Sequence, residues 1–585
     1  MRPSVIFDYV CKTTIMSKIA VFSVPFLLSI FACSSPEVAP EQAADQIFYN
    51  AQIITMDEAY DGKQKVEAVA VKDQKIIGIG KRKALRKFKG EQTEMRDLQG
   101  KTLLPGFIDG HSHFAFGVRM LKQANLSSPP VAEVRNIPDL IATLKTHQEK
   151  RNIPEGEWIL GWGYDPDQLE EQRHPNQEEL SKAFPDHPVY IRHASFHMGV
   201  ANQVAMQMAG IDDDTPNPPG GVIVRDESGK ATGLLQETAQ VLVADLIPPI
   251  GHLEMLDLVY EGQNYYASFG ITTMQEGLAD TLAYKVFKDA AAMELFLLDL
   301  EVLGSFRYLD YYMKEGNFGQ YNNGLKLAGI KITTDGSPQG KTAFFRRPYR
   351  TKVPGCIHDC RGYPMVPPSY LEQVMQICYD KGVQLYAHAN GDAAIDMLLD
   401  THQKVTDSLG IAANEQRTVV IHSQFVRPDQ LDRYIEYGFV PSFFTNHAFF
   451  WGDTHTANLG PKRANFLSPM KTADEMGIIA TNHTDYPVTP PDQLFLLWTS
   501  VTRQARSGNI MGKEQRASVY QGLKALTING AYQHHTEDIK GSISVGKLAD
   551  FVVLEKNPLT TEVDEIKDIE VLETIKGGYT IFERK

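Results

Sequence analysis

Two histidines separated by one residue, His111 and His113, follow the apolar segment Leu104–Ile108. On a β-strand, residues i and i+2 point to the same side, so both imidazoles would project together from a strand end. Two imidazoles on one face suit a divalent metal such as zinc. A bare His-x-His pair is more often a surface feature without ligands, but strand ends are where sites of parallel α/β barrels lie. The pair therefore predicts half of a metal site, and the other ligands must come from later strands.

Three later residues fall in or at the end of strand-like apolar runs. Lys331 lies within the run Leu327–Ile332, where a desolvated ammonium is costly. Either an acid at the strand end pairs with it, or CO2 carboxylates it to an anionic bridge between two metals. His388 and His422 each end a β-like run. Two such histidines in successive units are harder to explain structurally than one, and they favour a shared metal site.

Asp485 follows the apolar run Gly477–Thr481. An acid at this place can bind metal and take a proton from bound water, and a helix N-cap is the alternative.

The segment 443–451 is rich in aromatic residues, which predict an apolar wall for a substrate pocket. They are Phe443, Phe444, Phe449, Phe450 and Trp451.

The elements that must position these residues alternate apolar strands with amphipathic helices, the pattern of a parallel barrel. The stretch of about 115–255 is too long for a loop and predicts an inserted domain. Candidate barrel strands are Thr102–Ile108, Ile271–Gln275, Lys326–Thr333, Gln384–His388, Thr418–His422, Val440–Phe444 and Gly477–Thr481.

Both ends of the chain have the pattern of β-structure. Residues 46–104 and 536–585 alternate apolar and polar positions between turns, which predicts one composite β-sandwich built from both termini. The barrel then spans 105–535. The predicted fold class is α/β, a (β/α)8 TIM-type barrel with this composite β-sandwich and an inserted α+β domain.

The first residues, 1–33, have the pattern of an export signal, with Met16 as the expected true start. The apolar run Ile19–Ala32 is too short to span a membrane and contains Pro25, so it is typical of a cleaved signal.

The run ends at Ile30–Ser34, which resembles the lipobox of bacterial lipoproteins, with Cys33 as the lipidated residue. A plain secretory signal is the alternative. Residues 34–45 form a Pro/Ala-rich tether. Ser34 after the cysteine favours anchoring on the periplasmic side of the outer membrane.

Export bears on the remaining cysteines. Cys356 and Cys360 are placed for a small disulfide loop in an oxidising compartment, and with His358 between them an accessory metal site is the alternative. Cys378 lies in an apolar helical pattern and is expected to be a buried, inert thiol.

The composition fits a globular protein of more than one domain: 585 residues, 43% hydrophobic and 22% charged. A net charge of −14 argues against a nucleic-acid partner. We expect a small-molecule substrate and contact with membrane only through the lipid anchor. A homodimer is compatible with the sequence.

The order His-x-His, Lys, His, His, Asp resembles the amidohydrolase superfamily of metal-dependent hydrolases. The closer resemblance is to amidohydrolase family 3, the YtcJ-like or N-substituted formamide deformylase-like branch. The supporting motifs cover almost the whole mature chain. They include LPGFIDGHSHF at 104–114, GWGYDPDQL at 161–169, RHASFHMGVAN at 192–202, GLLQETA at 233–239, GITTMQEG at 270–277, GIKITTDGS at 329–337, YAHANGDAAID at 386–396 and TNHTDYPV at 481–488.

The resemblance implies one or two divalent metals, with Zn²⁺ expected. His111 and His113 match the first-strand pair, and Lys331 matches a lysine that is carboxylated and bridging in binuclear members. The remaining ligands match the fifth-, sixth- and eighth-strand positions: His388, His422 and Asp485.

By the same resemblance, His197 in the insert and Asp335 after the lysine would shape the substrate pocket. Trp162 and Arg503 are further candidates, with packing or a structural ion pair as the alternative for each. The chain departs from the family pattern before the aspartate, where His483-Thr484 replaces the usual Gly-Ser.

The function that follows is metal-dependent hydrolysis of a non-peptide C–N bond, in an amide, formamide or cyclic amide. Asp485 would act as general base and then as general acid. The alternatives are a deaminase or an ester or lactone hydrolase on the same fold, and a non-catalytic surface lipoprotein that binds metal or ligand.

Overall fold

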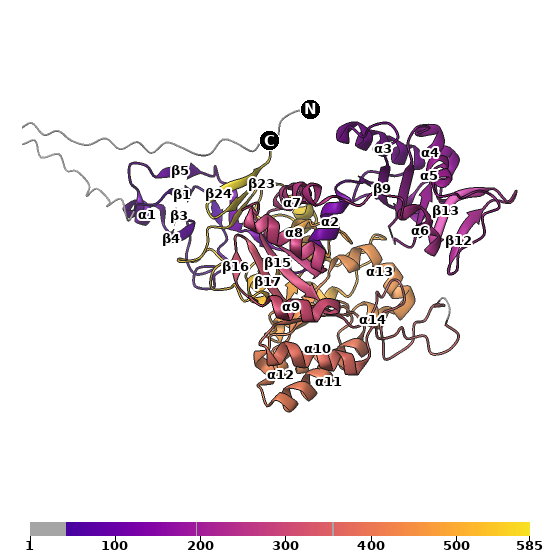
Figure 1. Cartoon of the computed structure of the whole chain (residues 1–585). Helices are drawn as coiled ribbons and strands as arrows, with labels where there is room; N and C mark the ends of the chain where they lie inside the picture. The colour runs from indigo at the N-terminus through magenta and orange to yellow at the C-terminus, as the bar shows by residue number, and fades with distance from the viewer. Residues whose placement is uncertain (1–42, 195, 354–355) are drawn as a thin grey trace, which may run out of the picture.

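A computed structural model describes residues 43–194, 196–353 and 356–585 (Figure 1). The predicted export signal, Cys33 and nearly all of the tether lie outside these residues. Within the described ranges, no helix is both long enough and apolar enough to cross a membrane.

The central element is a curled sheet of parallel strands. Its path runs β7 (Phe107–Ile108), β14 (Ile271–Ala279), β15 (Asp299–Ser305), β17 (Leu325–Thr333), β18 (Leu385–Ala389), β19 (Val419–His422), β20 (Val440–Phe443) and β21 (Thr481–Asn482). The short β16 (Tyr321–Asn322) pairs antiparallel with β17. Most residues of the longer strands are buried, as expected for a parallel sheet that helices cover.

The two ends of this path approach each other just beyond the strands. The backbone N–H of Asp485 donates to the carbonyl of His111 at 3.0 Å, and the N–H of His113 donates to the carbonyl of Tyr486 at 2.8 Å. Segments far apart in sequence are thereby joined, and they are the two that carry the predicted first and last ligands.

Amphipathic helices pack on the outside of the sheet. They are α2 (Phe114–Met120), α7 (His252–Ala267), α8 (Thr281–Ala292), α10 (Pro368–Asp380), α11 (Asp392–Leu409) and α12 (Pro428–Tyr437). In α11 the buried positions Ile395, Leu398 and Leu399 recur at helical spacing. The helix ends at Gly410, whose positive φ of 64° suits glycine.

Both ends of the chain contribute to a pair of sheets. One has the order β4–β3–β1–β5, and the other has the order β2–β6–β22–β23–β24. They share a buried core that joins N-terminal Phe48 and Val69 to C-terminal Phe551 and Ile575. Their strands are β1 (Gln46–Tyr49), β2 (Gln52–Ile53), β3 (Ala68–Lys72), β4 (Lys75–Gly80), β5 (Glu94–Asp97), β6 (Thr102–Pro105), β22 (Phe551–Leu554), β23 (Val571–Lys576) and β24 (Tyr579–Glu583).

The single strand predicted over Thr102–Ile108 is wrong, because the chain divides it at Gly106. Its first half, β6, pairs antiparallel with β22 in the terminal sheets, while β7 enters the curled sheet. A Cβ at Gly106 would lie 2.3 Å from Thr272, so only glycine allows this close crossing.

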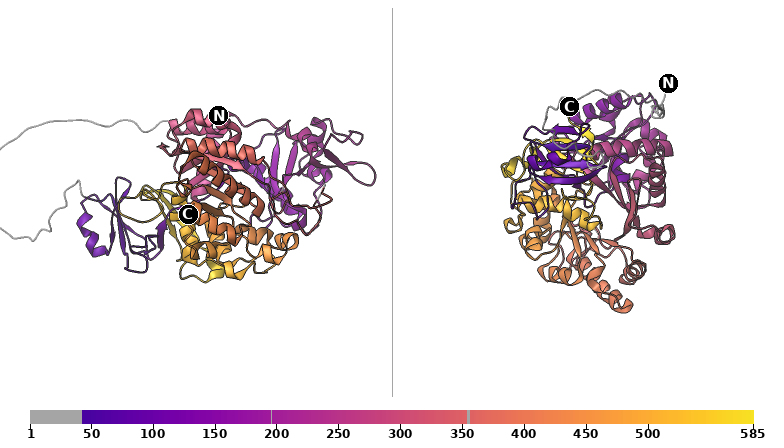
Figure 2. Two further views of the ribbon diagram at one scale, coloured as in Figure 1. Left: turned by 90° about the horizontal axis from the view of Figure 1, so that it is seen from below. Right: turned by 90° about the vertical axis from the view of Figure 1, so that its left-hand side faces the viewer.

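A third sheet lies within the predicted insertion, in the order β12–β13–β11–β10–β9–β8. Its strands are β8 (Ala124–Asn125), β9 (Ile159–Tyr164), β10 (Val189–His193), β11 (Met198–Ala201), β12 (Gly221–Arg225) and β13 (Ala231–Glu237). It has hydrophobic clusters of its own, and it lies on the opposite side of the curled sheet from the terminal sheets (Figures 1 and 2). The first residues of the predicted insertion form α2, which packs on α7 in the main core instead.

Two cysteines form the predicted small disulfide loop, and not the accessory metal site that was the alternative. Cys356 and Cys360 are bonded to each other, and Cys378 is a buried free thiol.

Candidate metal centre

The first group of donors gathers where β7, β17 and β21 end. Lys331 Nζ lies 2.9 Å from His111 Nε2. The Asp485 carboxylate oxygen Oδ1 lies 3.4 Å from His113 Nε2 and 3.8 Å from His111 Nε2. Two histidines, a lysine and an aspartate therefore converge on one small volume.

The second group is a pair of imidazoles beside the first. His388 Nδ1 and His422 Nε2 are 3.0 Å apart, and their rings are 4.5 Å apart between centroids. Ligand atoms of His111, His422 and Asp485 all lie within 4.8 Å of one another, so the two groups adjoin. The structure thus brings together all the side chains that the sequence analysis proposed as metal ligands.

Parallel register explains the meeting of the strand-borne donors. Thr333 aligns with His388, and Ala389 aligns with His422, so the ends of β17, β18 and β19 lie level. His422 and Asp485 have left-handed backbones, with φ of 71° and 54°. Such conformations cost about 1–3 kcal/mol each and concentrate at functional sites.

Gln275 holds His111 in one orientation. The amide oxygen Oε1 lies 2.5 Å from His111 Nδ1, and the amide nitrogen donates to the carbonyl of Gly110 at 3.1 Å. Because the amide is fixed by Gly110, its oxygen faces the ring and His111 must donate through Nδ1–H. The other nitrogen, Nε2, is then left with its lone pair toward Lys331 and Asp485, as a ligand requires. Sequence reasoning missed Gln275, since a lone glutamine in a strand gives no signal.

Burial keeps these groups in the forms that bind metal. It lowers the pKa of His111 well below the usual value, with the charge of Lys331 adding to the effect. Burial and then the neighbouring His388 and His483 lower the pKa of His422 well below the usual value. Burial and then Lys331 lower the pKa of His388 to about 3. Burial also lowers the pKa of Lys331 to about 7, opposed by Asp485 and Glu276. The imidazoles of His111, His388 and His422 are therefore neutral near pH 7.

The carboxylate of Asp485 has a buried oxygen without a hydrogen-bond partner. That oxygen is Oδ1, the atom that faces His111 and His113. Leaving a carboxylate oxygen buried and unpaired is costly unless a positive group compensates it. Imidazole and carboxylate donors are those that Zn²⁺ accepts, so the residues fit a divalent cation.

Asp109 positions the segment that carries Asp485. It is buried and accepts hydrogen bonds from the Thr484 N–H at 3.1 Å and from the Thr484 hydroxyl at 2.6 Å. Burial raises the pKa of Asp109 to about 7.

A sequence model of the amidohydrolase family matches residues 94–582, which is most of the chain. The chain belongs to this family. It is 26% identical to an N-substituted formamide deformylase of Arthrobacter pascens, over 93% of this chain and 99% of the relative. It is also 26% identical to a putative amidohydrolase, YtcJ, of Bacillus subtilis (strain 168), over 92% of this chain and 99% of the relative.

A solved structure with the same fold is an uncharacterized metal-dependent hydrolase from Pyrococcus furiosus. It has a TM-score of 0.69 and 23% identity, and the likeness covers 88% of this chain and all of that one. Membership of the family makes this protein a hydrolase, and the cluster of His111, His422 and Asp485 has the geometry of a site for a divalent metal.

The predicted substrate residues occupy varied positions in this amidohydrolase. Asp335 is fully buried and accepts N–H groups of Phe344, Asn390 and Gly391 at 2.8–2.9 Å. Burial raises the pKa of Asp335 to about 7. Its carboxylate therefore orders the loops around His388, which lies 3.6 Å away.

Two predicted substrate residues lie in the insert. His197 is exposed and pairs with Glu237 at 3.1 Å. Trp162 is buried with an unpartnered Nε1, and it lines a cavity of about 170 Å³ together with Tyr265 and Tyr486. Because Tyr486 directly follows Asp485, this cavity adjoins the segment that carries the proposed base.

The predicted aromatic wall divides into two parts. Phe443 and Phe444 are fully buried in the core and cannot line an open pocket. Phe449, Phe450 and Trp451 lie on α13 (Asn446–Leu459) and are partly exposed.

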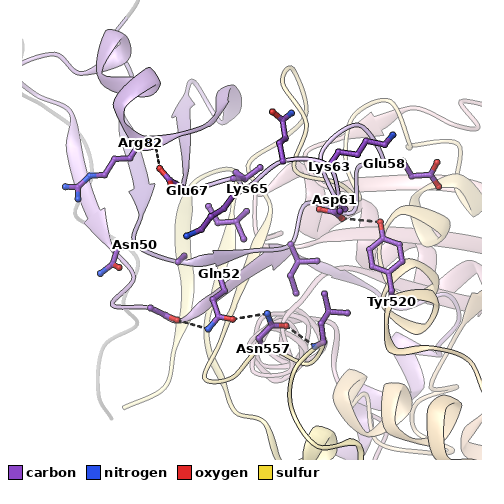
Figure 3. A pocket seen from close by; sticks show the side chains of 18 residues that line it. Asn50, Gln52, Glu58, Asp61, Lys63, Lys65, Glu67, Arg82, Tyr520 and Asn557 are labelled. Carbon is purple, nitrogen blue, oxygen red and sulfur yellow. Dashed lines mark hydrogen bonds between the residues drawn. The ribbon is translucent and has the colours of Figure 1, made fainter.

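A further cavity lies away from the metal ligands. It has a volume of about 1090 Å³ and is lined by residues of the terminal sheets and their neighbours, including Gln52, Asp61, Arg82, Tyr520 and Asn557 (Figure 3). Its polar side chains largely bond to one another or to the backbone, as Tyr520 does to Asp61.

The prediction that Arg503 contacts substrate is not supported. Its side chain is fully buried, and its guanidinium donates to the backbone carbonyls of Met511, Ser468 and Leu467 at 2.5, 3.2 and 2.7 Å. No carboxylate pairs with it within the described ranges. Arg503 therefore has the structural role that was the alternative, because its guanidinium joins two chain segments through their backbone carbonyls.

Replacing Arg503 by Met is expected to destabilise the protein by about 3 kcal/mol, because several buried carbonyls lose their donor. The check is chemical denaturation of both proteins. The KM of the folded variant should stay unchanged, and a large rise in KM without loss of stability would restore the substrate role.

Proposed function

We propose that this amidohydrolase hydrolyses a non-peptide C–N bond in an amide, a formamide or a cyclic amide. The observation that carries the proposal is the unpaired Oδ1 of Asp485, which faces two imidazoles at the mouth of the ligand cluster. A carboxylate in this place can bind a metal through one oxygen, and it can also orient a bound water and accept a proton from it.

The donors divide into two groups, and this favours two divalent ions, with Zn²⁺ expected from the nitrogen-rich set. His111, His113 and Asp485 would hold one ion, and His388 and His422 would hold the other. Lys331 lies beside His111 and, within the described part of the chain, has no acidic partner within 4.0 Å. This favours carboxylation of Lys331, which would place an anionic bridge between the ions.

When bound, such a metal lowers the pKa of coordinated water toward neutrality and polarises a carbonyl group. Asp485 orients the water and accepts its proton. The same carboxyl group then returns the proton to the leaving nitrogen, so that the amine departs neutral. Gln275 keeps the His111 lone pair directed at the site throughout.

We further propose that the curled sheet functions as a closed (β/α)8 barrel, with the terminal sheets as a composite β-sandwich. The two backbone hydrogen bonds between the segments after β7 and β21 support closure. We retain the proposal that the protein is exported and lipidated at Cys33. Radiolabelled palmitate incorporation that disappears in Cys33→Ala would test it, and equal labelling would refute it.

The reaction class is tested with a panel of amides, formamides, imides, esters and aminated heterocycles. Turnover confined to C–N bonds with release of an amine or an acid supports the proposal. Release of ammonia from a heterocycle, or turnover of esters alone, would support the deaminase or esterase alternative instead.

The lysine bridge predicts a defined metal content. Wild-type protein should carry about two equivalents of metal by elemental analysis, and Lys331→Ala should carry about one or fewer. Lys540→Ala is the matched control, because Lys540 is also a buried lysine but pairs with Asp299 away from the ligands. An unchanged content in Lys331→Ala would contradict the bridge.

A further inference from the structure

His483 is a buried histidine that the family pattern does not include. It lies between β21 and Asp485, and none of its surface is exposed. Its Nε2 is 3.0 Å from His422 Nδ1, and its Nδ1 is 2.9 Å from the hydroxyl of Ser442. Ser442, His483 and His422 are therefore connected by consecutive hydrogen bonds, and the last of them is a proposed metal ligand.

The direction of each hydrogen bond follows from the chemistry of neutral imidazole, which carries one N–H. His422 turns Nε2 toward His388, so Nε2 must keep its lone pair if it is to bind metal. Its proton then resides on Nδ1 and is donated to His483 Nε2. His483 in turn carries its proton on Nδ1 and donates it to Ser442.

His483 is itself excluded as a ligand to the same ion. Its Nε2 faces the nitrogen of His422 that points away from His388. Because it is fully buried, it also cannot touch substrate in this arrangement. Phe444 packs against its ring at 4.9 Å between centroids and helps to fix the ring plane.

We propose that His483 is a positioning residue for His422, which it holds with Nε2 directed at the second metal position. This inference rests on the proposed metal site. The proposal also gives a reason why His483-Thr484 replaces the usual Gly-Ser. The side chains of glycine and serine are too short to reach His422 and accept its hydrogen bond, whereas the imidazole of His483 does reach it. His422 has a left-handed backbone, and the bond to His483 helps to keep it in that conformation.

The test compares full-length wild type with His483→Leu and His483→Gln. Leucine keeps much of the volume but removes the acceptor, whereas the glutamine oxygen can reach the place of Nε2. His402→Leu is the control for loss of a buried imidazole, because His402 bonds to Tyr379 and the carbonyl of Ala413 and touches no proposed ligand. The readouts are Zn²⁺ affinity of each equivalent by chelator competition and the absorption spectrum of the Co²⁺-loaded protein.

In His483→Leu, one of the two equivalents should bind about 10–100-fold more weakly, with a changed Co²⁺ spectrum, while the other is unaffected. His483→Gln should recover most of the affinity, and His402→Leu should bind like wild type. Equal affinity and spectrum in wild type and His483→Leu would overturn the inference. Equal weakening in His483→Leu, His483→Gln and His402→Leu would also overturn it. Failure of wild type to bind any Zn²⁺ would instead refute the proposed function itself.

Discussion

Asp485→Asn is expected to lower kcat by about 10²–10⁴-fold on the amide or formamide that the wild type hydrolyses best. Asparagine keeps the size of the side chain and one carbonyl oxygen but cannot accept a proton. The loss should therefore fall on kcat, while KM changes little, because the substrate contacts outside the base are untouched. Steady-state kinetics of both proteins at matched metal loading measures the effect.

Metal content must be measured beside the rates, because the amide is also a weaker metal ligand than the carboxylate. Asp492→Asn is the matched control. Asp492 is a partly buried carboxylate that caps α16 (Gln493–Thr502) through the N–H groups of Leu494 and Phe495, and asparagine caps equally well. Its turnover should match wild type. Equal turnover of Asp485→Asn at full metal loading would refute Asp485 as the base.

The ligands could be predicted from sequence because each lies in, ends or follows an apolar run. In a parallel sheet, residues at the carboxyl ends of strands share an edge, so His388 and His422 must lie near His111. That argument needs only the order of the strands and no side-chain geometry. For this reason the candidate ligands are found together in the structure.

The partners of those ligands could not be predicted, because they come from residues without a chemical signature. Gln275 lies on a neighbouring strand and Ser442 on another, and only their three-dimensional register turns them toward His111 and His483. Arg503 was misjudged for the related reason that its carbonyl partners belong to the backbone, which no sequence pattern reveals.

Strand β15 was missed because its charged residues interrupt the apolar pattern from which buried strands are predicted. Its residues Asp299 and Glu301 are polar, so the segment was not among the predicted strands. In the structure Asp299 pairs with Lys540 and Lys576, and Glu301 lies 3.3 Å from Lys326. Lys326 comes from the adjacent strand β17, while Lys540 and Lys576 come from the C-terminal segment. These lysines compensate charges that are otherwise too costly to bury.

Removal of metal by a strong chelator is expected to abolish hydrolysis and to lower the melting temperature. A ligand present at about 1,000 times its Kd stabilises the native state by about 4 kcal/mol, and this stabilisation disappears with the ligand. The Asp485 carboxylate and the closely spaced imidazoles would be left without the cation that their arrangement fits. Calorimetry and activity assays before chelation, after it and after addition of Zn²⁺ measure both effects.

The double variant His111→Ala/His113→Ala supplies the control for chelation. It should have no activity, and its melting temperature should fall less on chelation than that of wild type, because the first metal position has lost its imidazoles while His388 and His422 remain at the second. Restored activity of wild type on adding Zn²⁺, and none in the double variant, would tie the effect to these histidines. If chelated wild type kept both its activity and its melting temperature, the metal centre would be refuted. A different outcome would favour the non-catalytic binding protein. In that case the chelated wild type would keep its melting temperature, and no substrate of the panel would be hydrolysed before or after addition of Zn²⁺. A cluster of donor side chains can persist in a fold after the catalytic activity has been lost.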